Sequence, residues 1–359
     1  MRPGRRLAAW TTFLLLGACS SSGDSGSPGT TDAGADATDA AMPDAMMPPK
    51  DAGSTMDASR DAGGDSGKAD ATSPCMPLRH FTFTSTAVVP LGCDANAPAT
   101  ILDVPVPATG RALGRATFSV QHTGANSVTH FWNVQVHVGS AKDPYGLGDD
   151  VCPGTTSARE NLGFGVLSAQ AGSASVVGYS GAAPCTPGTL QVLAGATLEI
   201  WVEDPAPACA GGDLAFASYY DAEGFTTEYD WTTSFTQLPG VTASLATTGA
   251  SETMRVLGVV EGSPHLDPNT TCGSEVSTID LETALDGQPM EYVREVVPAS
   301  QGMGHRVLFT SGDTNELRAV TPGMHAASLL VASDFVVSGQ PVTTGGCCGD
   351  GEVALLRMR

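Results

Sequence analysis

The feature that most constrains the fold is an alternation of apolar and polar residues along many short segments. Apolar side chains recur at every second position from Trp132 to Val138, and again from Leu198 to Val202. A period of two places successive side chains on opposite faces of a β-strand. Gly and Pro interrupt these segments throughout, and no segment has a convincing helical period. The pattern predicts an all-β fold in which sheets pack as β-sandwiches.

One turn can be placed from two residues. Asp286-Gly287 separates the segments 279–285 and 290–297, both of which read as strands. An Asp-Gly pair between two strands is typical of a two-residue β-hairpin. We therefore expect these two segments to pair antiparallel.

Similar short motifs recur in the same order in two halves of the chain, which predicts a tandem duplication. It divides the chain near residue 225 into two jelly-roll-like repeats, 75–225 and 226–359, each long enough for its own core. The matched landmarks are Thr123-Gly124-Ala125 with Thr248-Gly249-Ala250, Gly139-Ser140 to Cys152 with Gly262-Ser263 to Cys272, Leu190 to Gly195 with Leu317 to Gly323, and Cys209 to Phe216 with Cys348 to Leu355.

The first residues indicate export. Three arginines precede an apolar run from Leu7 to Leu16, which is about half the length that a membrane-spanning helix needs and suits a signal peptide. The run ends in Leu16-Gly17-Ala18-Cys19, which resembles the lipobox of bacterial lipoproteins. The alternative is an ordinary signal peptide with a chance cysteine.

The lipobox resemblance covers residues 1–20 only and concerns location. It implies removal of residues 1–18, a diacylglycerol on the sulfur of Cys19, and a membrane partner reached through that lipid. Because Ser20 rather than Asp follows the cysteine, the resemblance also implies the outer membrane, with the protein facing the periplasm or the cell surface.

Residues 19–74 have a different composition from the rest. After Cys19 they contain no aromatic residue and no Val, Ile or Leu, and ten Asp stand against three Lys or Arg. Such a segment cannot bury enough apolar surface to offset the entropy of ordering. We expect a disordered linker that acts as a stalk.

The chain is acidic, with a formal net charge of −21. Nucleic acid is excluded as a partner, because phosphate binding needs clustered Lys and Arg. The acidity permits cation binding, and it also serves solubility.

Eight cysteines follow the linker, an even number that suits disulfides in an exported protein. If the repeats are equivalent, Cys152–Cys209 and Cys272–Cys348 form one bridge in each. Cys75 and Cys93 then form a local bridge, and Cys185 and Cys347 pair across the repeats. A vicinal Cys347–Cys348 bridge is the rival arrangement.

Two candidate binding sites follow from the pattern. Asn133, Gln135 and His137 form a polar row along one strand, with Trp132 as an aromatic neighbour; such a row can bind a sugar, or it is the solvated face of an antiparallel strand. The second candidate is a Ca²⁺ site on Gly-rich loops that carry oxygen ligands, for which ordinary turn chemistry is the alternative. Its residues are Asp143, Asp149, Asp150 and Asp267.

Catalytic motifs are weak. Gly178-Tyr179-Ser180-Gly181 lacks the spacing of a nucleophile elbow, and the seven histidines form no His-x-His or His-Glu-x-x-His motif. Tandem jelly rolls bind copper in ascorbate-dependent monooxygenases, but the paired histidines of that family are missing here.

The sequence therefore favours a surface-displayed, non-catalytic binding or adhesion lipoprotein for a carbohydrate or a surface protein. One alternative is a metal-assisted enzyme, with copper or another metal between two jelly-roll domains. The other is a structural envelope lipoprotein.

Overall fold

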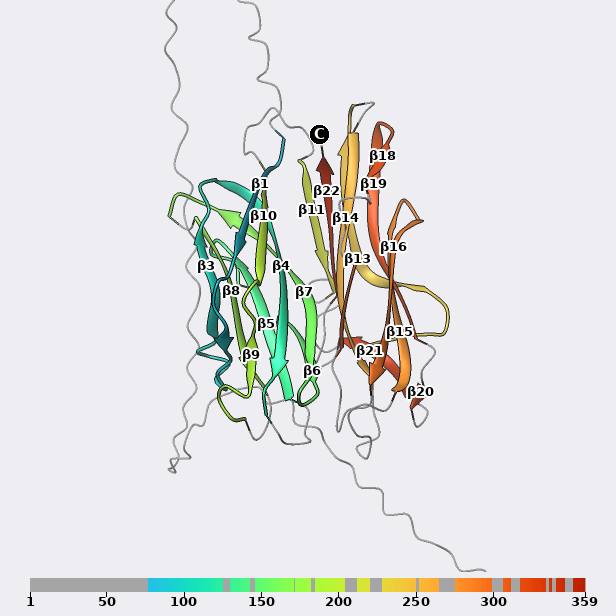
Figure 1. Ribbon diagram of the computed structural model, residues 1–359. Helices are drawn as coiled ribbons and strands as arrows, with labels where there is room; N and C mark the ends of the chain where they lie inside the picture. The colour runs from blue at the N-terminus through green and yellow to red at the C-terminus, as the bar shows by residue number, and fades with distance from the viewer. Residues whose placement is uncertain are drawn as a thin grey trace, which may run out of the picture. The chain divides into compact units, whose positions relative to one another are not determined.

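The computed structural model shows two β-sandwiches (Figure 1). Within the residues described, no helix has the length and apolar character needed to cross a membrane. The structure describes residues 77–124, 130–142, 146–170, 172–181, 185–203, 212–219, 228–249, 252–264, 275–298, 306–310, 317–333, 336–337, 340–345 and 351–358.

The first sandwich has two facing antiparallel sheets. One sheet has the order β1-β10-β4-β7, with β9 and β2 beside the end of β4; the other has the order β3-β8-β5-β6. The strands are β1 Arg79–Thr84, β2 Val89–Pro90, β3 Ala99–Pro105, β4 Gly110–His122, β5 His130–Val138, β6 Leu147–Val151, β7 Thr156–Leu167, β8 Ser173–Ser180, β9 Leu190–Val192 and β10 Thr197–Val202.

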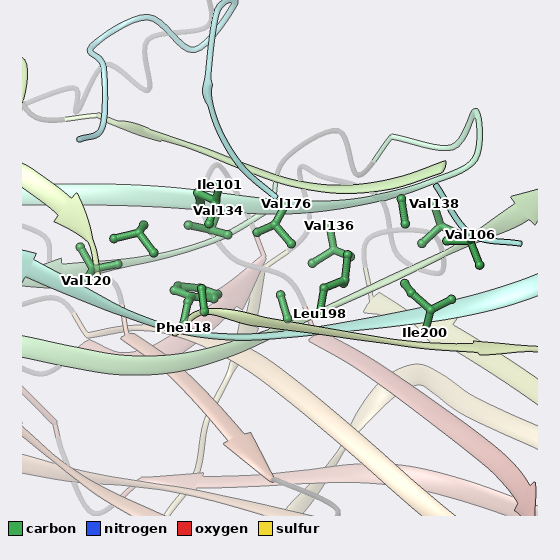
Figure 2. Packing of buried hydrophobic residues seen from close by; sticks show 14 of the residues in the cluster. Ile101, Val106, Phe118, Val120, Val134, Val136, Val138, Val176, Leu198 and Ile200 are labelled. Carbon is green, nitrogen blue, oxygen red and sulfur yellow. The ribbon is translucent and has the colours of Figure 1, made fainter. Parts of the chain in front are cut away.

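The core of the first sandwich is the layer between its two sheets. The predicted alternation is visible in β5, where Trp132, Val134, Val136 and Val138 are all buried. Figure 2 shows the valines of this strand facing Leu198 and other apolar side chains of the opposite sheet. Branched side chains suit this position because they pack well on a pleated surface.

The second sandwich repeats this arrangement. Its sheets have the orders β11-β22-β14-β17 and β13-β19-β15-β16, and β21, β12, β18 and β20 extend the first of them. The strands are β11 Leu214–Ser218, β12 Glu228–Asp230, β13 Thr236–Thr247, β14 Glu252–Pro264, β15 Glu275–Leu285, β16 Gln288–Pro298, β17 Arg306–Thr310, β18 Arg318–Val320, β19 Gly323–Ser333, β20 Val336–Val337, β21 Gln340–Gly345 and β22 Gly351–Met358.

Strand pairing confirms the two tandem sandwiches. It does not confirm that the short motifs matched between the two halves lie on equivalent strands. In both sandwiches the first strand pairs with the last, and the last strand pairs in turn with the fourth. The other pairings follow the same order, so β1 to β7 correspond to β11 to β17. The Thr-Gly-Ala motifs precede β5 and β14, which are not equivalent strands. Short turn motifs recur in any chain of hairpins, so they do not identify equivalent strands.

The boundary between the sandwiches also differs from residue 225. Strand β11 begins at Leu214 and pairs with β22, so it belongs to the second sandwich. The motif matched between β11 and β22 therefore joins two neighbouring strands of one sheet and not equivalent strands of two sandwiches.

The predicted hairpin is confirmed. Asp286 and Gly287 have φ values of 53° and 71° and connect β15 to β16. The pairing shifts by one residue at Thr283/Ala284, so that Glu282 lies opposite Tyr292 and Asp280 lies opposite Arg294. This bulge decides which side chains of β16 face outward.

The cysteine pairing predicted from the repeats is wrong where it can be tested. Cys93 is bonded to Cys185, which rules out Cys75–Cys93 and Cys185–Cys347. The connection from β2 to β3 lies beside the end of β8, where Ser180 donates a backbone hydrogen bond to Gly92. Cys152 is also disulfide-bonded. Cys75, Cys209, Cys272, Cys347 and Cys348 lie outside the described residues.

The two sandwiches share an apolar contact between their first sheets. It contains Leu113, Leu147, Leu162, Trp201, Leu214, Leu257, Val259, Ala354 and Leu356. Buried charges surround it, and each has a partner: Arg115 contacts Glu160 and Glu199, and Arg357 contacts Asp213 at 2.5 Å. Across the contact, the backbone N–H of Gly148 donates to Glu261 at 3.0 Å.

Candidate functional site

The predicted sugar face on β5 is only partly assembled. Asn133, Gln135 and His137 alternate with the core residues of the strand and so point away from the core. Trp132 is fully buried and meets Phe118 edge to face at 5.3 Å. It lies on the opposite face of the strand from the polar row, so it offers no platform to a ligand there.

The polar row is largely engaged within the protein. Nε2 of His137 lies 3.1 Å from Oε1 of Gln135, at hydrogen-bonding distance. Burial and the nearby charge of Lys142 lower the pKa of His137. Asn133 is buried, and its cross-strand neighbour on the same face is Tyr179. This face therefore has an aromatic residue, but it is Tyr179 rather than Trp132.

The predicted calcium ligands do not form a site in the described part of the chain. Asp149 is fully buried, and its Oδ2 accepts hydrogen bonds from Arg159 at 2.8 Å and Ser157 at 3.0 Å. A guanidinium at that distance supplies the positive charge that calcium would bring. Asp150 lies on β6, whereas Asp143 and Asp267 lie outside the described residues.

The described histidines occupy separate places. His80 stacks on Trp201 at 4.9 Å, His122 accepts a hydrogen bond from the backbone of Gly124, and His325 contacts Asp286. Across the described ranges, no three His, Cys, Asp or Glu side chains gather as they would around a metal ion. His265 and His305 lie outside those ranges, and of His130 only the position on β5 is described.

An aromatic pair stands on the outer face of the second sandwich. Phe235, just before β13, and Tyr292, on β16, meet at 5.9 Å with their rings nearly perpendicular. Both are exposed, to 37% and 47%. The strands between them are β19 and β15, which present Ala332 beside Asp280 and Leu330 beside Glu282 on this face. We call this face, defined by Phe235, Tyr292, Asp280, Glu282, Arg294, Leu330 and Gln237, the outer aromatic face.

Tyr292, one ring of the aromatic pair, is held by a hydrogen-bonded ion pair. Arg294 donates to both carboxylate oxygens of Asp280, at 2.7 and 2.9 Å, and Tyr292 donates its hydroxyl hydrogen to Asp280 at 2.9 Å. The guanidinium of Arg294 also lies 5.8 Å from the centre of the Tyr292 ring. Burial, Asp280 and its charge together raise the pKa of Tyr292. These contacts fix the ring orientation before any ligand arrives.

Glu282 differs from the other charged groups of this face. It lies between Tyr292 on β16 and Leu330 on β19, and partial burial raises its pKa. No hydrogen bond or ion pair reaches its carboxylate from the residues that the structure describes. It is therefore an acceptor still available to a ligand.

The outer aromatic face combines two chemical properties. Its rings offer apolar surface, and Glu282 and Gln237, in the same row of the sheet as Tyr292 and Leu330, offer hydrogen-bonding groups. A flat amphipathic molecule, with C–H groups on one side and hydroxyls at its rim, fits such a surface. Sequence reasoning missed it because Phe235 and Tyr292 lie far apart in the chain, and because the bulge in the β15–β16 hairpin reverses the face of Tyr292.

Comparison with known proteins gives fold likenesses only. No protein-family model and no curated protein matches the sequence. PNGase F, a glycosylasparaginase from Flavobacterium meningosepticum, is 9% identical over 78% of this chain and 96% of its own, with a TM-score of 0.33. PNGF-II is 8% identical over 77% of this chain, with a TM-score of 0.32, and the chain spans 65% of its length.

A tandem of two CBM22 domains from Paenibacillus barcinonensis Xyn10C is 10% identical over 79% of this chain and 91% of its own, with a TM-score of 0.25. All of these values are too low for an activity to be transferred. What the chain has in its own right is an all-β architecture of two tandem sandwiches.

Proposed function

We propose that this protein is a surface-displayed, non-catalytic binding lipoprotein whose outer aromatic face binds carbohydrate. The observation that carries the proposal is the exposed pair Phe235 and Tyr292, in which Tyr292 is fixed by Asp280 and Arg294. Single exposed apolar residues are ordinary on protein surfaces, but two exposed rings in contact, one of them oriented by a hydrogen bond, indicate a recognition surface.

The preorganised geometry favours a rigid, flat ligand. Because Tyr292 is already fixed through its hydroxyl group, binding costs little side-chain entropy at this position. A sugar ring places its C–H groups on an aromatic ring and its hydroxyls on neighbouring acceptors. Glu282 and Gln237 are the nearest polar groups in the row that Tyr292 begins.

The proposed location is a membrane surface. The lipobox at Cys19 provides the membrane anchor, and the acidic segment up to residue 74 provides the stalk that holds the sandwiches away from the lipid. The Cys93–Cys185 disulfide supports export, because such bonds persist in oxidising compartments.

A glycan array tests the proposal with the full chain in mild detergent. We expect the wild-type protein to bind a subset of glycans, and Phe235→Ala to lose most of that signal. The control is Val166→Ala, which removes an exposed apolar side chain from β7 of the first sandwich. The proposal fails if no glycan binds, or if the two variants bind alike.

A further inference from the structure

We propose that the carbohydrate recognised by the outer aromatic face carries a free amino group, which Glu282 binds as an ammonium ion. This inference rests on the proposed function and specifies its ligand class. The charges of Asp280, Glu282 and Arg294 on this face are not balanced.

The charges of Asp280 and Arg294 cancel each other. The two groups form a two-point ion pair, with distances of 2.7 and 2.9 Å. Tyr292 adds a third contact to the same carboxylate. Asp280 is thereby occupied, and a ligand would have to break these contacts to reach it.

Glu282 is left with an uncompensated charge. Its neighbours across the strands are an aromatic ring, Tyr292, and an aliphatic side chain, Leu330. Neither side chain supplies a positive charge, and the surroundings remove part of the water from the carboxylate, which raises its pKa. A partly dehydrated carboxylate gains most from a ligand that brings a cation and a hydrogen-bond donor together.

The position of Glu282 selects the kind of cation. A ligand ring that stacks beside Tyr292 has its rim one strand spacing from Glu282, since the two residues are a direct cross-strand pair. An amino group on that rim can donate to the carboxylate while the ring remains stacked. Acidic sugars are disfavoured, because Glu282 repels them and the whole chain carries a net charge of −21.

Calorimetry with three matched oligosaccharides tests the inference on the full chain in mild detergent. The probes are a glucosamine oligomer with free amines, its N-acetylated form, and a cellulose oligomer of equal length, at a pH of about 6, where an ordinary Glu is ionised. We expect the amine form to bind roughly tenfold more tightly than the other two, as a charge-assisted hydrogen bond predicts. Added salt should reduce that preference.

The variant Glu282→Gln removes the charge and keeps the shape. We expect it to bind all three probes with nearly equal affinity, at the level of the neutral ones. The control is Asp103→Asn, an exposed acid on β3 in the corresponding sheet of the first sandwich, which should keep the preference for the amine.

The outcomes separate this inference from the proposed function. Equal binding of the three probes to the wild-type protein overturns the amine preference and leaves carbohydrate binding standing. A preference that survives in Glu282→Gln, or one that is insensitive to salt, overturns the role of Glu282. If none of the probes and no glycan of the array binds, carbohydrate binding itself is wrong, and this inference is wrong with it.

Discussion

The outer faces of two equivalent sheets, β3-β8-β5-β6 and β13-β19-β15-β16, differ in chemistry, whereas their inner faces are alike. Both inner faces are continuous apolar layers. On the first outer face the polar groups of β5 contact one another, as His137 does Gln135. The second presents an exposed aromatic pair and the available carboxylate of Glu282. Packing constrains the inward positions of a sandwich, whereas its outward positions are free to differ.

The largest effect is expected from breaking the ion pair that fixes the last strand of the second sandwich. Arg357 is fully buried and donates to Asp213 and to the backbone oxygens of Gly212 and Ala246. Arg357→Ala leaves Asp213 charged and buried, which should reduce the free energy of unfolding by about 3–5 kcal/mol. Urea denaturation measures this. The double variant with Asp213→Ala should recover part of the loss; an equal or larger loss would contradict the explanation.

A smaller effect is expected from the disulfide, which lies in the first sandwich. Cys93 and Cys185 are 92 residues apart in sequence, so the bond restricts the unfolded chain strongly. Replacing both with Ala should cost about 2–4 kcal/mol. Thermal melting with and without reductant measures this. Reductant should shift the wild-type transition more than that of the variant, and equal shifts would show that this bond contributes little.

Binding should be sensitive to an aromatic residue on only one of the two faces. Tyr292→Ala removes an exposed ring from the outer aromatic face, and we expect at least about a tenfold loss of glycan affinity, or roughly 1.4 kcal/mol. Tyr179→Ala changes the corresponding face of the first sandwich and should leave the affinity unchanged. If both variants lose affinity equally, the functional difference between the faces does not exist.

The smallest effect concerns pH at the β15–β16 hairpin. Burial alone would lower the pKa of His325, but hydrogen bonds to Asp286 and Thr321 and the charges of Asp286 and Glu252 raise it. Its stabilising contribution is therefore complete below the usual His pKa of about 6.5 and is lost as pH rises through the higher folded value.

We expect His325→Gln to flatten this part of the stability–pH curve. The change should be below about 1 kcal/mol, because Asp286 is half exposed and screened by water. Urea midpoints at several pH values, compared with those of a His80→Gln control, measure it. A curve that rises with pH in the wild-type protein would contradict the assignment.

Much of the fold could be predicted because it depends on local patterns. The alternation along β5 placed Val134, Val136 and Val138 on one face of a strand, although Trp132 was assigned to a ligand site and lies in the core instead, and Asp286-Gly287 placed the hairpin. The equivalence of the strands could not be predicted from short motifs, since Thr-Gly-Ala occurs before strands that are not equivalent. Which cysteines pair depends on loops that meet only in the folded sandwich, as Cys93 and Cys185 do.

The outer aromatic face could not be predicted, because it depends on one register shift in the β15–β16 hairpin. With regular pairing from the Asp286-Gly287 turn, Glu282 would lie opposite Glu291, and Tyr292 would face the core. The register shift at Thr283/Ala284 instead puts Tyr292 beside Glu282. A one-residue shift exchanges the two faces of a strand, and the binary pattern of β16 was too mixed to reveal it.

The pairing of the first strand with the last in each sandwich has a consequence for assembly. Strand β1 joins β10, and β11 joins β22. Because a chain is synthesised from its N-terminus, the first sandwich can complete its sheet once Val202 has been made, before the strands of the second are available. The second cannot complete its sheet until β22 has been made, so its unpaired strands stay exposed for longer. The half of the molecule that carries the aromatic pair is therefore the half more open to misfolding during synthesis.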